Sequence, residues 1–556
     1  MKANRLISTL LATSILSTML VGCSSTEQGN SGEVGAAKDT IVYSMNTAQQ
    51  GIFNPLISNL ISDKYVNSVT YASLMTVNSD GDLEPYLAEE FKVSDDEKTI
   101  TYDIKDNAVW HDGEKVTAED VAFTFTSMAA GDYTGGYYGD VKNIKGAEDY
   151  HDGKADSVEG IKIIDEDTVE IEFESTYAPA VTNLGTVQIL PEHVWGEIAP
   201  GEWPNQTELL NNPVGCGPYK LTEYKSGSHV KFEAADNFFG GDVKTPNLVF
   251  KVINADTTQT EFKNGAIDVA NVEGLRKADI DALTKEGYET KEFSNFVFTY
   301  MGFNLRNENL NNVKLRQAFM HAINRQGIVD NVVEGRGQVV DAPMLPSLWS
   351  YPEQSVLNDY KYDEQKAKDL LKEAGWEDKD GDGIVENSKG EKLELSLVCQ
   401  TDNPVRQKSA LIIQENLKAI GVKIDIESME YSAVMDKVVA NHDFDLYMMG
   451  NTLSLDPNPR PMWHSDAISH EAGVIGYNIV AYENEETDKL IEEGNSVIDQ
   501  AQRKEIYSKF GQILNEDVPE VYLFCQNIER AYNPNLEGYA PSTFNEFYNV
   551  HNWEVK

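Results

Sequence analysis

The chain has 556 residues, of which 41% are hydrophobic, so it can bury more than one core and we expect two or three domains. It carries 91 acidic and 46 basic residues, which gives a formal net charge of -45 at pH 7. A surface this acidic repels nucleic acid and anionic membrane, so we expect no nucleic acid among the partners. The same charge favours a soluble protein, and we expect a monomer.

The N-terminus has the pattern of a secretion signal. Lys2 and Arg5 precede an apolar run over residues 6–21, which is too short to span a bilayer comfortably. The run ends in Leu20-Val21-Gly22-Cys23, which resembles a lipoprotein lipobox. We therefore expect a signal peptide over residues 1–22, lipid on Cys23, a flexible tether over residues 23–38, and a place on the extracellular face of the cell membrane. The alternative is an ordinary signal peptide with a chance cysteine.

The first predicted elements of the folded part are a strand over residues 40–45 and a helix carrying Val66, Val69, Leu74 and Met75. From residue 80 to 211, short alternating runs predict a strand-rich region. Its strands include residues 99–104 and two strands on either side of a turn at residues 165–167.

Residues 110–125 (WHDGEKVTAEDVAFTF) predict a turn and then a helix. Asp112 can accept a hydrogen bond from the backbone two residues on, and Gly113 tolerates a positive φ, so the chain reverses there. Thr117 is a good N-cap, and Asp120 stands three residues later in the capping-box position. We expect this segment to be a scaffold corner rather than a catalytic acid–base pair.

The second half of the chain predicts further strands and helices. A strand over residues 299–305 leads into a helix over residues 313–324, capped by Arg325, and the first crossing between domains is expected near Gly302. A strand at residues 393–400 precedes an amphipathic helix over residues 407–420, which ends at Gly421. A helix over residues 505–515 precedes a strand at residues 521–524.

Residues 378–383 (DKDGDG) have the opening of a calcium loop, with oxygen ligands at alternate positions and a glycine at position six. Position twelve is Lys389, which puts a cation where a bidentate Glu is required. Structural calcium and an acidic hairpin turn without metal both stay open. The expected ligands are Asp378, Asp380, Asp382, Ile384 and Glu386.

The remaining cysteines, Cys216, Cys399 and Cys525, are far apart and form no C-x-x-C pair. At most one disulfide can form among them. We expect small buried thiols.

Three motifs resemble those of one family. Residues 110–121 follow its pattern WHDG-x-x-[LV]-TAEDV, residues 212–219 (NPVGCGPY) follow N-P-V-G-[TS]-G-P-Y, and residues 456–465 (DPNPRPMWHS) follow D-P-D-P-x-x-x-W-H-S. The chain therefore resembles the extracellular solute-binding protein family 5, the dipeptide and oligopeptide receptors of ABC importers, from residue 39 to residue 556.

The resemblance implies an α/β, two-lobed periplasmic-binding-protein-like fold of type II, cluster C, with an extra inserted strand-rich subdomain. Lobe I is expected to comprise residues 39–79, 212–300 and 525–556, with the subdomain at residues 80–211. Lobe II is expected to comprise residues 301–524. Two such lobes close around a ligand at hinges of a few residues.

The resemblance also implies a set of ligand-binding residues. Arg406 is expected to meet a peptide carboxylate, because a cation at a helix start is disfavoured by the dipole unless an anion joins it; a surface salt bridge is the alternative. Asp456 is expected to meet the peptide ammonium group, and Trp463 to form an apolar wall or a core contact. The remaining expected contacts are Asn54, Gly215, Cys216, Gly217 and Asn304.

The resemblance implies a binding protein without chemistry or cofactor, which captures oligopeptides and delivers them to permease subunits in the membrane. A nickel complex, haem, an oligosaccharide or a peptide pheromone are alternative ligands on the same fold. A secreted hydrolase is the rival of another class, but the chain has no H-E-x-x-H, G-x-S-x-G or P-loop motif. A purely structural surface protein is the third hypothesis.

Overall fold

The computed structural model describes residues 38–556. The predicted signal peptide, Cys23 and the tether up to residue 37 lie outside the described residues. Lys38, expected in the tether, is instead held by the folded part: its backbone N–H donates to the Val555 carbonyl at 3.0 Å, and its ammonium group pairs with Asp268 at 2.7 Å. Among the described residues, no helix has both the length and the apolar character that a membrane span requires.

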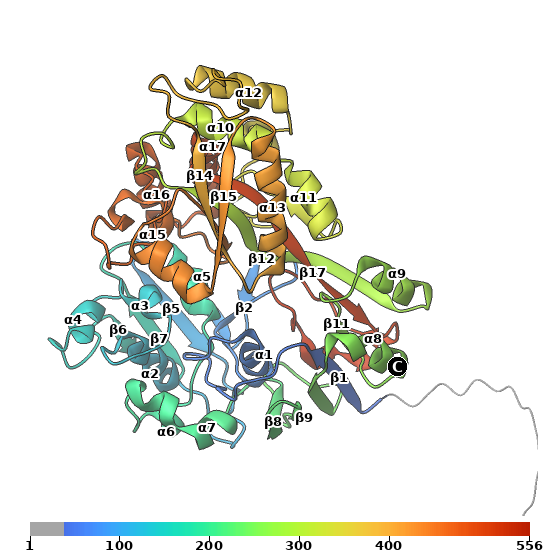
Figure 1. Ribbon diagram of the computed structural model, residues 1–556. Helices are drawn as coiled ribbons and strands as arrows, with labels where there is room; N and C mark the ends of the chain where they lie inside the picture. The colour runs from blue at the N-terminus through green and yellow to red at the C-terminus, as the bar shows by residue number, and fades with distance from the viewer. Residues whose placement is uncertain (1–37) are drawn as a thin grey trace, which may run out of the picture. The chain divides into compact units, whose positions relative to one another are not determined.

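A single mixed sheet of eleven strands runs through the described part of the chain (Figure 1). In spatial order its strands are β15 (Lys423–Met429), β14 (Glu394–Gln400), β16 (Leu446–Thr452), β12 (Glu289–Phe303), β17 (Glu520–Tyr532), β11 (Val269–Asn271), β1 (Thr40–Met45), β10 (Asn247–Val252), β9 (His229–Ala234) and β8 (Tyr219–Lys225), and β13 (Gly337–Val339) pairs with β17. The predicted strands at residues 40–45 and 393–400 are thereby confirmed.

One hydrophobic core belongs to each end of this sheet. Core residues between Phe298 and Cys525 form a single cluster, which is lobe II. Its helices are α10 (Val313–Ala322), α11 (Arg325–Val332), α12 (Glu364–Glu373), α13 (Pro404–Lys418), α14 (Tyr431–Val434), α15 (Arg460–Trp463), α16 (Glu485–Ser496) and α17 (Gln500–Asp517), and a π-helical turn spans Met435–Ala440.

Lobe I is built on β1, β8, β9, β10 and β11, together with the C-terminal segment. Its core residues include Tyr43, Phe250 and Trp553, all fully buried. Its helices are α1 (Ile61–Thr70), α8 (Ala255–Lys263) and α9 (Lys277–Lys285), and β18 (Leu536–Glu537) pairs with β19 (Glu554–Val555). The predicted helix through Met75 is therefore too long, because the chain becomes extended at Tyr71.

A further cluster, from Leu56 to Phe239, belongs mainly to the inserted subdomain. A four-stranded sheet in the order β4 (Ala88–Val93), β5 (Thr99–Ile104), β7 (Thr168–Glu172) and β6 (Ile161–Ile163) packs there, beside the hairpin of β2 (Met75–Val77) and β3 (Leu83–Pro85). The predicted strands on either side of residues 165–167 are confirmed. The helices are α2 (Ala118–Ala129), α3 (Tyr138–Val141), α4 (Ala147–His151), α5 (Pro179–Thr186), α6 (Glu192–Trp195) and α7 (Thr207–Asn211).

The lobes are joined through β12 and β17, which pair with each other on both sides of an irregularity. The register shifts between Ser294 and Phe298, where Ser294 faces Asn527 and Phe298 faces Cys525. Phe298 and Cys525 already belong to the core of lobe II. We therefore place the crossing at residues 294–298 rather than near Gly302, which is packed directly against the Tyr447 ring.

The three cysteines of the described part, Cys216, Cys399 and Cys525, are buried and free. The prediction of small buried thiols is confirmed. Burial raises the pKa of the Cys216 thiol to about 12, so this thiol stays protonated and unreactive at neutral pH.

Candidate ligand-binding site

The segment at residues 110–125 forms a scaffold corner, as predicted. The helix α2 begins at Ala118 with Thr117 as its N-cap. The carboxylate of Asp120 accepts hydrogen bonds from three N–H groups: the Thr117 N–H at 2.9 Å, the Glu192 N–H at 2.8 Å and the buried Trp110 indole at 3.2 Å. The Asp120 side chain thus joins the start of α2, the turn at Trp110 and the start of α6.

His111 and Asp112 have different partners. The His111 backbone N–H donates to the Gly215 carbonyl at 2.7 Å, and its Nε2 lies 2.9 Å from the Gly217 carbonyl. The Asp112 carboxylate lies 2.8 Å from Nε2 of His193, at the surface. Burial lowers the pKa of the His111 imidazole to about 4, so its Nε2–H donates from the neutral form.

This buried imidazole predicts a pH dependence of stability. His111 takes up a proton at its ordinary pKa of 6.5 in the unfolded chain but only near pH 4 in the folded one. Between these values the unfolded chain binds more protons, so stability is complete above pH 6.5 and falls as the pH drops towards 4, by at most about 3 kcal/mol. Urea unfolding at pH 7, 5.5 and 4.5 measures this dependence. Between pH 7 and pH 4.5 the free energy of unfolding should fall less in His111→Gln than in the wild type. The exposed His470→Gln should keep the wild-type slope, and equal slopes for all three proteins would contradict the assignment.

The predicted contacts at Gly215, Cys216 and Gly217 are packing contacts instead. The Gly217 N–H donates to the Thr70 carbonyl at 2.8 Å, so it cannot serve a ligand. A Cβ at Gly215 would collide with the same carbonyl, at the end of α1. Cys216 is 2% exposed. The glycines are needed because the scaffold corner and α1 approach backbone to backbone.

Asn54 and Asn304 also make structural contacts rather than the predicted ligand contacts. Asn54 is fully buried, and its Oδ1 accepts from the Leu56 N–H at 2.9 Å, which is the local bond of an Asn-Pro turn. The Asn304 amide donates to the Phe444 carbonyl at 2.8 Å and ties the end of β12 to the chain before β16.

The arrangement of β14, β15 and β16 defines a more specific site. The three strands are parallel, so their carboxyl ends, Gln400, Met429 and Thr452, lie at one edge of the sheet. Crevices at the carboxyl ends of parallel strands are where open α/β sheets bind ligands. The ladder between β14 and β16 ends at Val398 and Tyr447, whereas β12 pairs with β16 as far as Thr452. The end of β16 therefore has one edge that no described strand covers.

Arg406 lies beside this open edge. It is in the first turn of α13, where Asn403 caps the helix by accepting the Arg406 N–H at 2.9 Å. Its guanidinium donates to the Gln400 side chain and lies so close to Gly450 of β16 that a Cβ there would collide with it.

The guanidinium of Arg406 is half-buried and incompletely paired. Its Nε is buried without an acceptor, and within residues 38–556 no acidic side chain forms an ion pair with it. Burial lowers the pKa of Arg406 from its ordinary value, although a guanidinium stays charged in proteins. An uncompensated cation at a helix start and a strand edge is a site for an anion.

Tyr431 is a residue of this site that sequence reasoning missed. It stands two residues after β15, at the start of α14, the residue is 49% exposed, and its hydroxyl is among the groups that raise the pKa of Arg406. An aromatic residue just after the carboxyl end of a strand was the available signal. The ring can cover a ligand bound at Arg406.

Asp456 does not take the role predicted for it. Both of its carboxylate oxygens accept from Arg503 of α17, at 2.7 and 2.5 Å, and its residue exposure is 5%. Arg503 also donates its Nε to the Gly494 carbonyl at 2.9 Å. The pair is a buried structural ion pair that anchors the loop after β16, and both oxygens of Asp456 already have a charged partner.

A small cavity of about 90 Å³ lies between this loop and α17, and we call it the neutral pocket. Trp463 lines it, as predicted, although the residue is 2% exposed and its ring also packs edge-on against Tyr482 at 6.1 Å. The core interpretation of this tryptophan is confirmed, and its role as a wall for a ligand side chain stays a prediction. The pocket is lined by Pro343, Met344, Leu348, Ser350, Asn451, Thr452, Leu453, Ser454, Pro457, Asn458, Pro459, Met462, Trp463, Tyr507 and Phe510.

The inserted subdomain touches lobe II next to this pocket. The Asn458 amide donates to the Tyr177 hydroxyl at 3.3 Å. The Ala178 N–H donates to the Asn495 carbonyl at 2.9 Å. These contacts bring the chain before α5 to the loop after β16, so both lobes border the site. Neither contact was predicted, because their partners are far apart in sequence.

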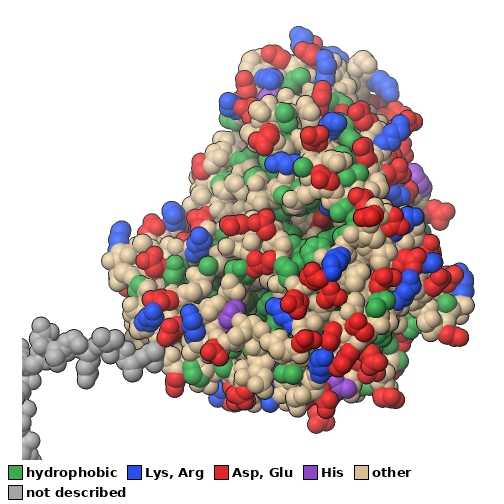
Figure 2. All heavy atoms as spheres, turned by 180° about the vertical axis from the view of Figure 1, so that it is seen from behind, with side chains coloured by type: hydrophobic (Ala, Val, Ile, Leu, Met, Phe, Trp, Pro, Cys, Tyr) green, Lys and Arg blue, Asp and Glu red, His purple; other side chains and the backbone are tan. Residues whose placement is uncertain are grey.

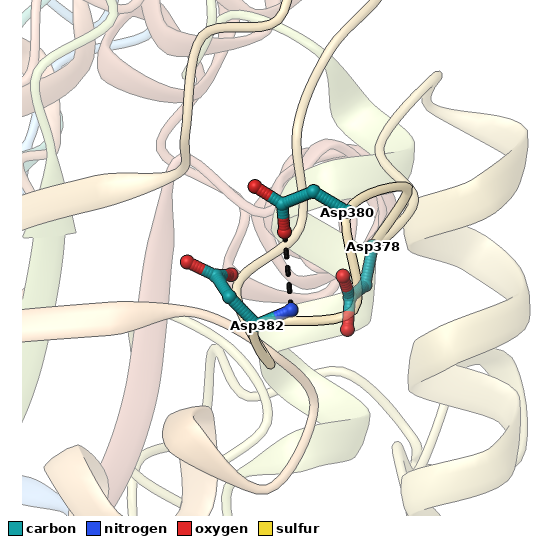
Figure 3. A group of neighbouring side chains, drawn as sticks. All are labelled: Asp378, Asp380 and Asp382. Atoms are coloured by element: carbon teal, nitrogen blue, oxygen red, sulfur yellow. Dashed lines mark hydrogen bonds between the residues drawn. The ribbon is translucent and has the colours of Figure 1, made fainter.

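The three aspartates of the predicted calcium loop lie together on an exposed hairpin (Figure 3). Asp378 accepts the N–H groups of Gly381 at 2.7 Å and Gly383 at 3.1 Å, and Asp380 accepts the Asp382 N–H at 3.0 Å. The Lys392 ammonium pairs with Asp380 at 3.3 Å and with Asp382.

One of the expected calcium ligands, Glu386, is placed differently, whereas the role of the Ile384 carbonyl stays a prediction. Glu386 is not part of the aspartate group, and its carboxylate accepts the Lys379 N–H at 2.8 Å. Ile384 donates its N–H to Asp382 at 3.0 Å. The loop thus satisfies its own carboxylates with backbone donors and one lysine.

Acidic side chains cover much of the face drawn in Figure 2, and hydrophobic side chains gather in its middle. The balance of 91 acidic to 46 basic residues thus reaches the surface. On such a surface an unpaired, partly buried arginine is unusual, because a cation there normally finds a carboxylate partner.

Comparison with known proteins agrees with this architecture. The model of bacterial extracellular solute-binding proteins, family 5 middle, matches residues 82–470. The chain is 30% identical over 556 residues to the oligopeptide-binding protein AppA of Bacillus subtilis (strain 168), covering 97% of this chain and 96% of that protein.

Two solved structures are similar along nearly their whole length. AppA from Bacillus subtilis in complex with a nonapeptide has a TM-score of 0.72 at 29% identity, covering 93% of this chain and 99% of that one. NikZ from Campylobacter jejuni in complex with Ni(L-His) has a TM-score of 0.73 at 26% identity, with the same coverage. The predicted two-lobed α/β fold is confirmed, and the chain belongs to the family 5 bacterial extracellular solute-binding proteins.

Proposed function

We propose that the protein captures oligopeptides between its two lobes and hands them, unaltered, to the permease of an ABC importer. The observation that carries this proposal is the uncompensated guanidinium of Arg406 beside the open edge of β16. A strand edge offers main-chain donors and acceptors that suit any peptide sequence, and an arginine fork suits a carboxylate. The names of AppA as an oligopeptide-binding protein and of its nonapeptide complex support the same ligand class.

The lobes that would close on the peptide are lobe I, with residues 39–79, 212–300 and 525–556, and lobe II, with residues 301–524. The subdomain at residues 80–211 adds a wall through Tyr177. The register irregularity at Ser294 and Phe298 supplies a place where the paired strands can bend.

We further propose that the protein is held on the extracellular face of the membrane by lipid on Cys23, after removal of residues 1–22. The pattern of Lys2, Arg5 and the apolar run before Cys23 supports this. One acyl chain binds a membrane only marginally, so stable anchoring requires two or more. The partners would then be the peptide and the permease, with the protein itself a monomer.

A nickel complex is the second candidate ligand, because NikZ is named with Ni(L-His). Within residues 38–556, however, the one group of metal-ligating side chains is the exposed trio of aspartates, which is outside the proposed site. Haem, an oligosaccharide and a peptide pheromone are ligands that the same fold could also accommodate. A hydrolase is disfavoured, because His111 and Asp112 serve different partners.

The direct test is native mass spectrometry of protein purified without denaturation, followed by calorimetric titration with synthetic peptides of two to nine residues. Bound peptide released at its full length and a saturable titration would support the proposal. Release of cleaved peptide would favour the hydrolase. No binding of any peptide, together with stabilisation by a nickel complex or haem, would move the assignment to those ligands.

For the acidic hairpin we propose that Lys392, rather than calcium, neutralises Asp380 and Asp382. Calcium and chelator should then leave the melting temperature of the wild type unchanged. In Lys392→Met the aspartates lose their cation, and calcium at about 100 times its Kd should stabilise that variant by about 2.7 kcal/mol. Differential scanning fluorimetry measures the melting temperatures of the wild type and of Lys392→Met with calcium and with chelator. A wild-type protein that melts at lower temperature in chelator would instead establish calcium in this loop.

A further inference from the structure

We propose that the neutral pocket takes an uncharged, apolar side chain at the amino-terminal end of the peptide, and that the site does not read a free ammonium group there. The inference rests on the proposed function and adds a ligand class to it. It follows from three properties of the chain after β16: a carboxylate that is already paired, a pocket lining without charge, and a fixed spacing from Arg406.

The first property is the pairing of Asp456. Its side chain is 6% exposed and that of Arg503 4%, and the two meet through two short hydrogen bonds. A second cation could reach this carboxylate only by entering a pair that is almost completely closed to solvent. Breaking such a pair leaves an uncompensated buried charge, which costs far more than a peptide ammonium group recovers.

Arg503 is also prevented from moving away. Its guanidinium lies 5.2 Å from the centre of the Trp349 ring and 5.5 Å from that of Tyr507, and its Nε donates to the Gly494 carbonyl. Cation–π contacts and a buried hydrogen bond hold it in one orientation. The acid of this loop is therefore fixed by the fold of the free protein.

The second property is the lining of the neutral pocket. None of its residues carries a charge; its walls are aliphatic and aromatic, and the polar groups among them are neutral hydroxyl and amide groups. An ammonium group placed there would lose its water without gaining a counter-charge. The volume of about 90 Å³ is roughly six times the minimum that holds one water molecule, which suits a side chain of valine to methionine size.

The third property is spacing. Gly450, next to Arg406, and Leu453, in the pocket wall, are three positions apart on the chain that continues β16. An extended chain rises about 3.3 Å per residue, so the two points are about 10 Å apart. A peptide that pairs with this edge and sets its carboxylate on Arg406 brings the side chain about three residues earlier to the pocket. The carboxyl end of the peptide is then recognised through its charge by Arg406, and the amino-terminal side chain through its shape by the neutral pocket.

Calorimetric titration with tetrapeptides X-Ala-Ala-Ala tests this, with X as leucine, lysine or aspartate and each with a free or acetylated amino terminus. We expect leucine to bind at least 10-fold tighter than lysine or aspartate, and acetylation to change Kd by less than 3-fold. A loss of 10-fold or more on acetylation, or equal binding of leucine and lysine, would overturn the inference and leave the proposed function intact. If none of the free peptides binds, the proposed function itself fails.

Two variants at the pocket give independent readouts. Met462→Trp fills the pocket and should abolish the advantage of leucine, whereas the matched Met462→Leu should keep it. Ser454→Asp adds an unpaired acid to the exposed pocket mouth and should make free peptides bind about 10-fold tighter than acetylated ones. An unchanged ratio in Ser454→Asp would show that the amino terminus lies elsewhere and would overturn the inference. Melting curves confirm that each variant is folded.

Discussion

Replacing Arg503 by methionine should lower the free energy of unfolding by about 3–5 kcal/mol, because it leaves the Asp456 carboxylate buried without its partner. The change also removes the hydrogen bond to the Gly494 carbonyl and the contacts with Trp349 and Tyr507. Urea unfolding at pH 7, followed by tryptophan fluorescence, measures the difference. This is the largest stability effect that we expect from one substitution outside the apolar cores.

A matched surface pair provides the control for this result. Arg460 also pairs with an aspartate, Asp466, but their side chains are 40% and 53% exposed. Arg460→Met should therefore cost no more than about 1 kcal/mol. The double variant Arg503→Met, Asp456→Leu should recover most of the loss, since an apolar pair can replace a buried ion pair. Equal losses for Arg503→Met and Arg460→Met would show that the Asp456 pair is not buried in solution.

The second large effect concerns binding. Arg406→Ala should weaken the binding of peptides with a free carboxylate by about 30-fold or more, because truncating one partner of a buried charge pair costs 2 kcal/mol or more. Peptides amidated at the C-terminus have no charge for the guanidinium and should bind wild type and variant alike. Titration of the same sequence in its acid and amide forms separates the two cases.

Two further variants sharpen the binding test. Arg406→Lys keeps the charge but loses the planar fork, so it should recover only part of the affinity for the acid form. Lys408→Ala removes an exposed cation two residues further along α13, and it should change the affinity for neither the acid nor the amide form. If Arg406→Ala weakens acid and amide forms equally, the arginine shapes the site without meeting the carboxylate.

Local structure could be predicted from the sequence wherever one segment carries its own signals. The N-cap Thr117 and Asp120 define the start of α2, and strict alternation defines β5 and β7. The helix predicted over residues 313–324 was too long, because a capping signal near its end was overlooked. Asn324 accepts the Gly327 N–H and is the N-cap of α11, so it begins the next helix, and Arg325 opens that helix instead of ending the previous one.

The site was less predictable, because its residues are defined by partners far away in sequence. The sequence places Arg406 at a helix start, but only the fold shows that, within residues 38–556, no acidic side chain forms an ion pair with it. Asp456 looked available for a ligand until Arg503, 47 residues later, proved to hold it. Asn304 bonds to the Phe444 carbonyl, which becomes its neighbour only on folding.

The passage of β12 and β17 between the lobes has a mechanical consequence. Because the two strands are hydrogen-bonded to each other above and below the irregularity, they act as one ribbon, and neither can swing alone. We expect bending at the residues between Ser294 and Phe298, which have no partner on β17, although Val297 still pairs with Thr452 of β16. Amide hydrogen exchange should therefore be fast in these few residues and slow on either side, with or without peptide.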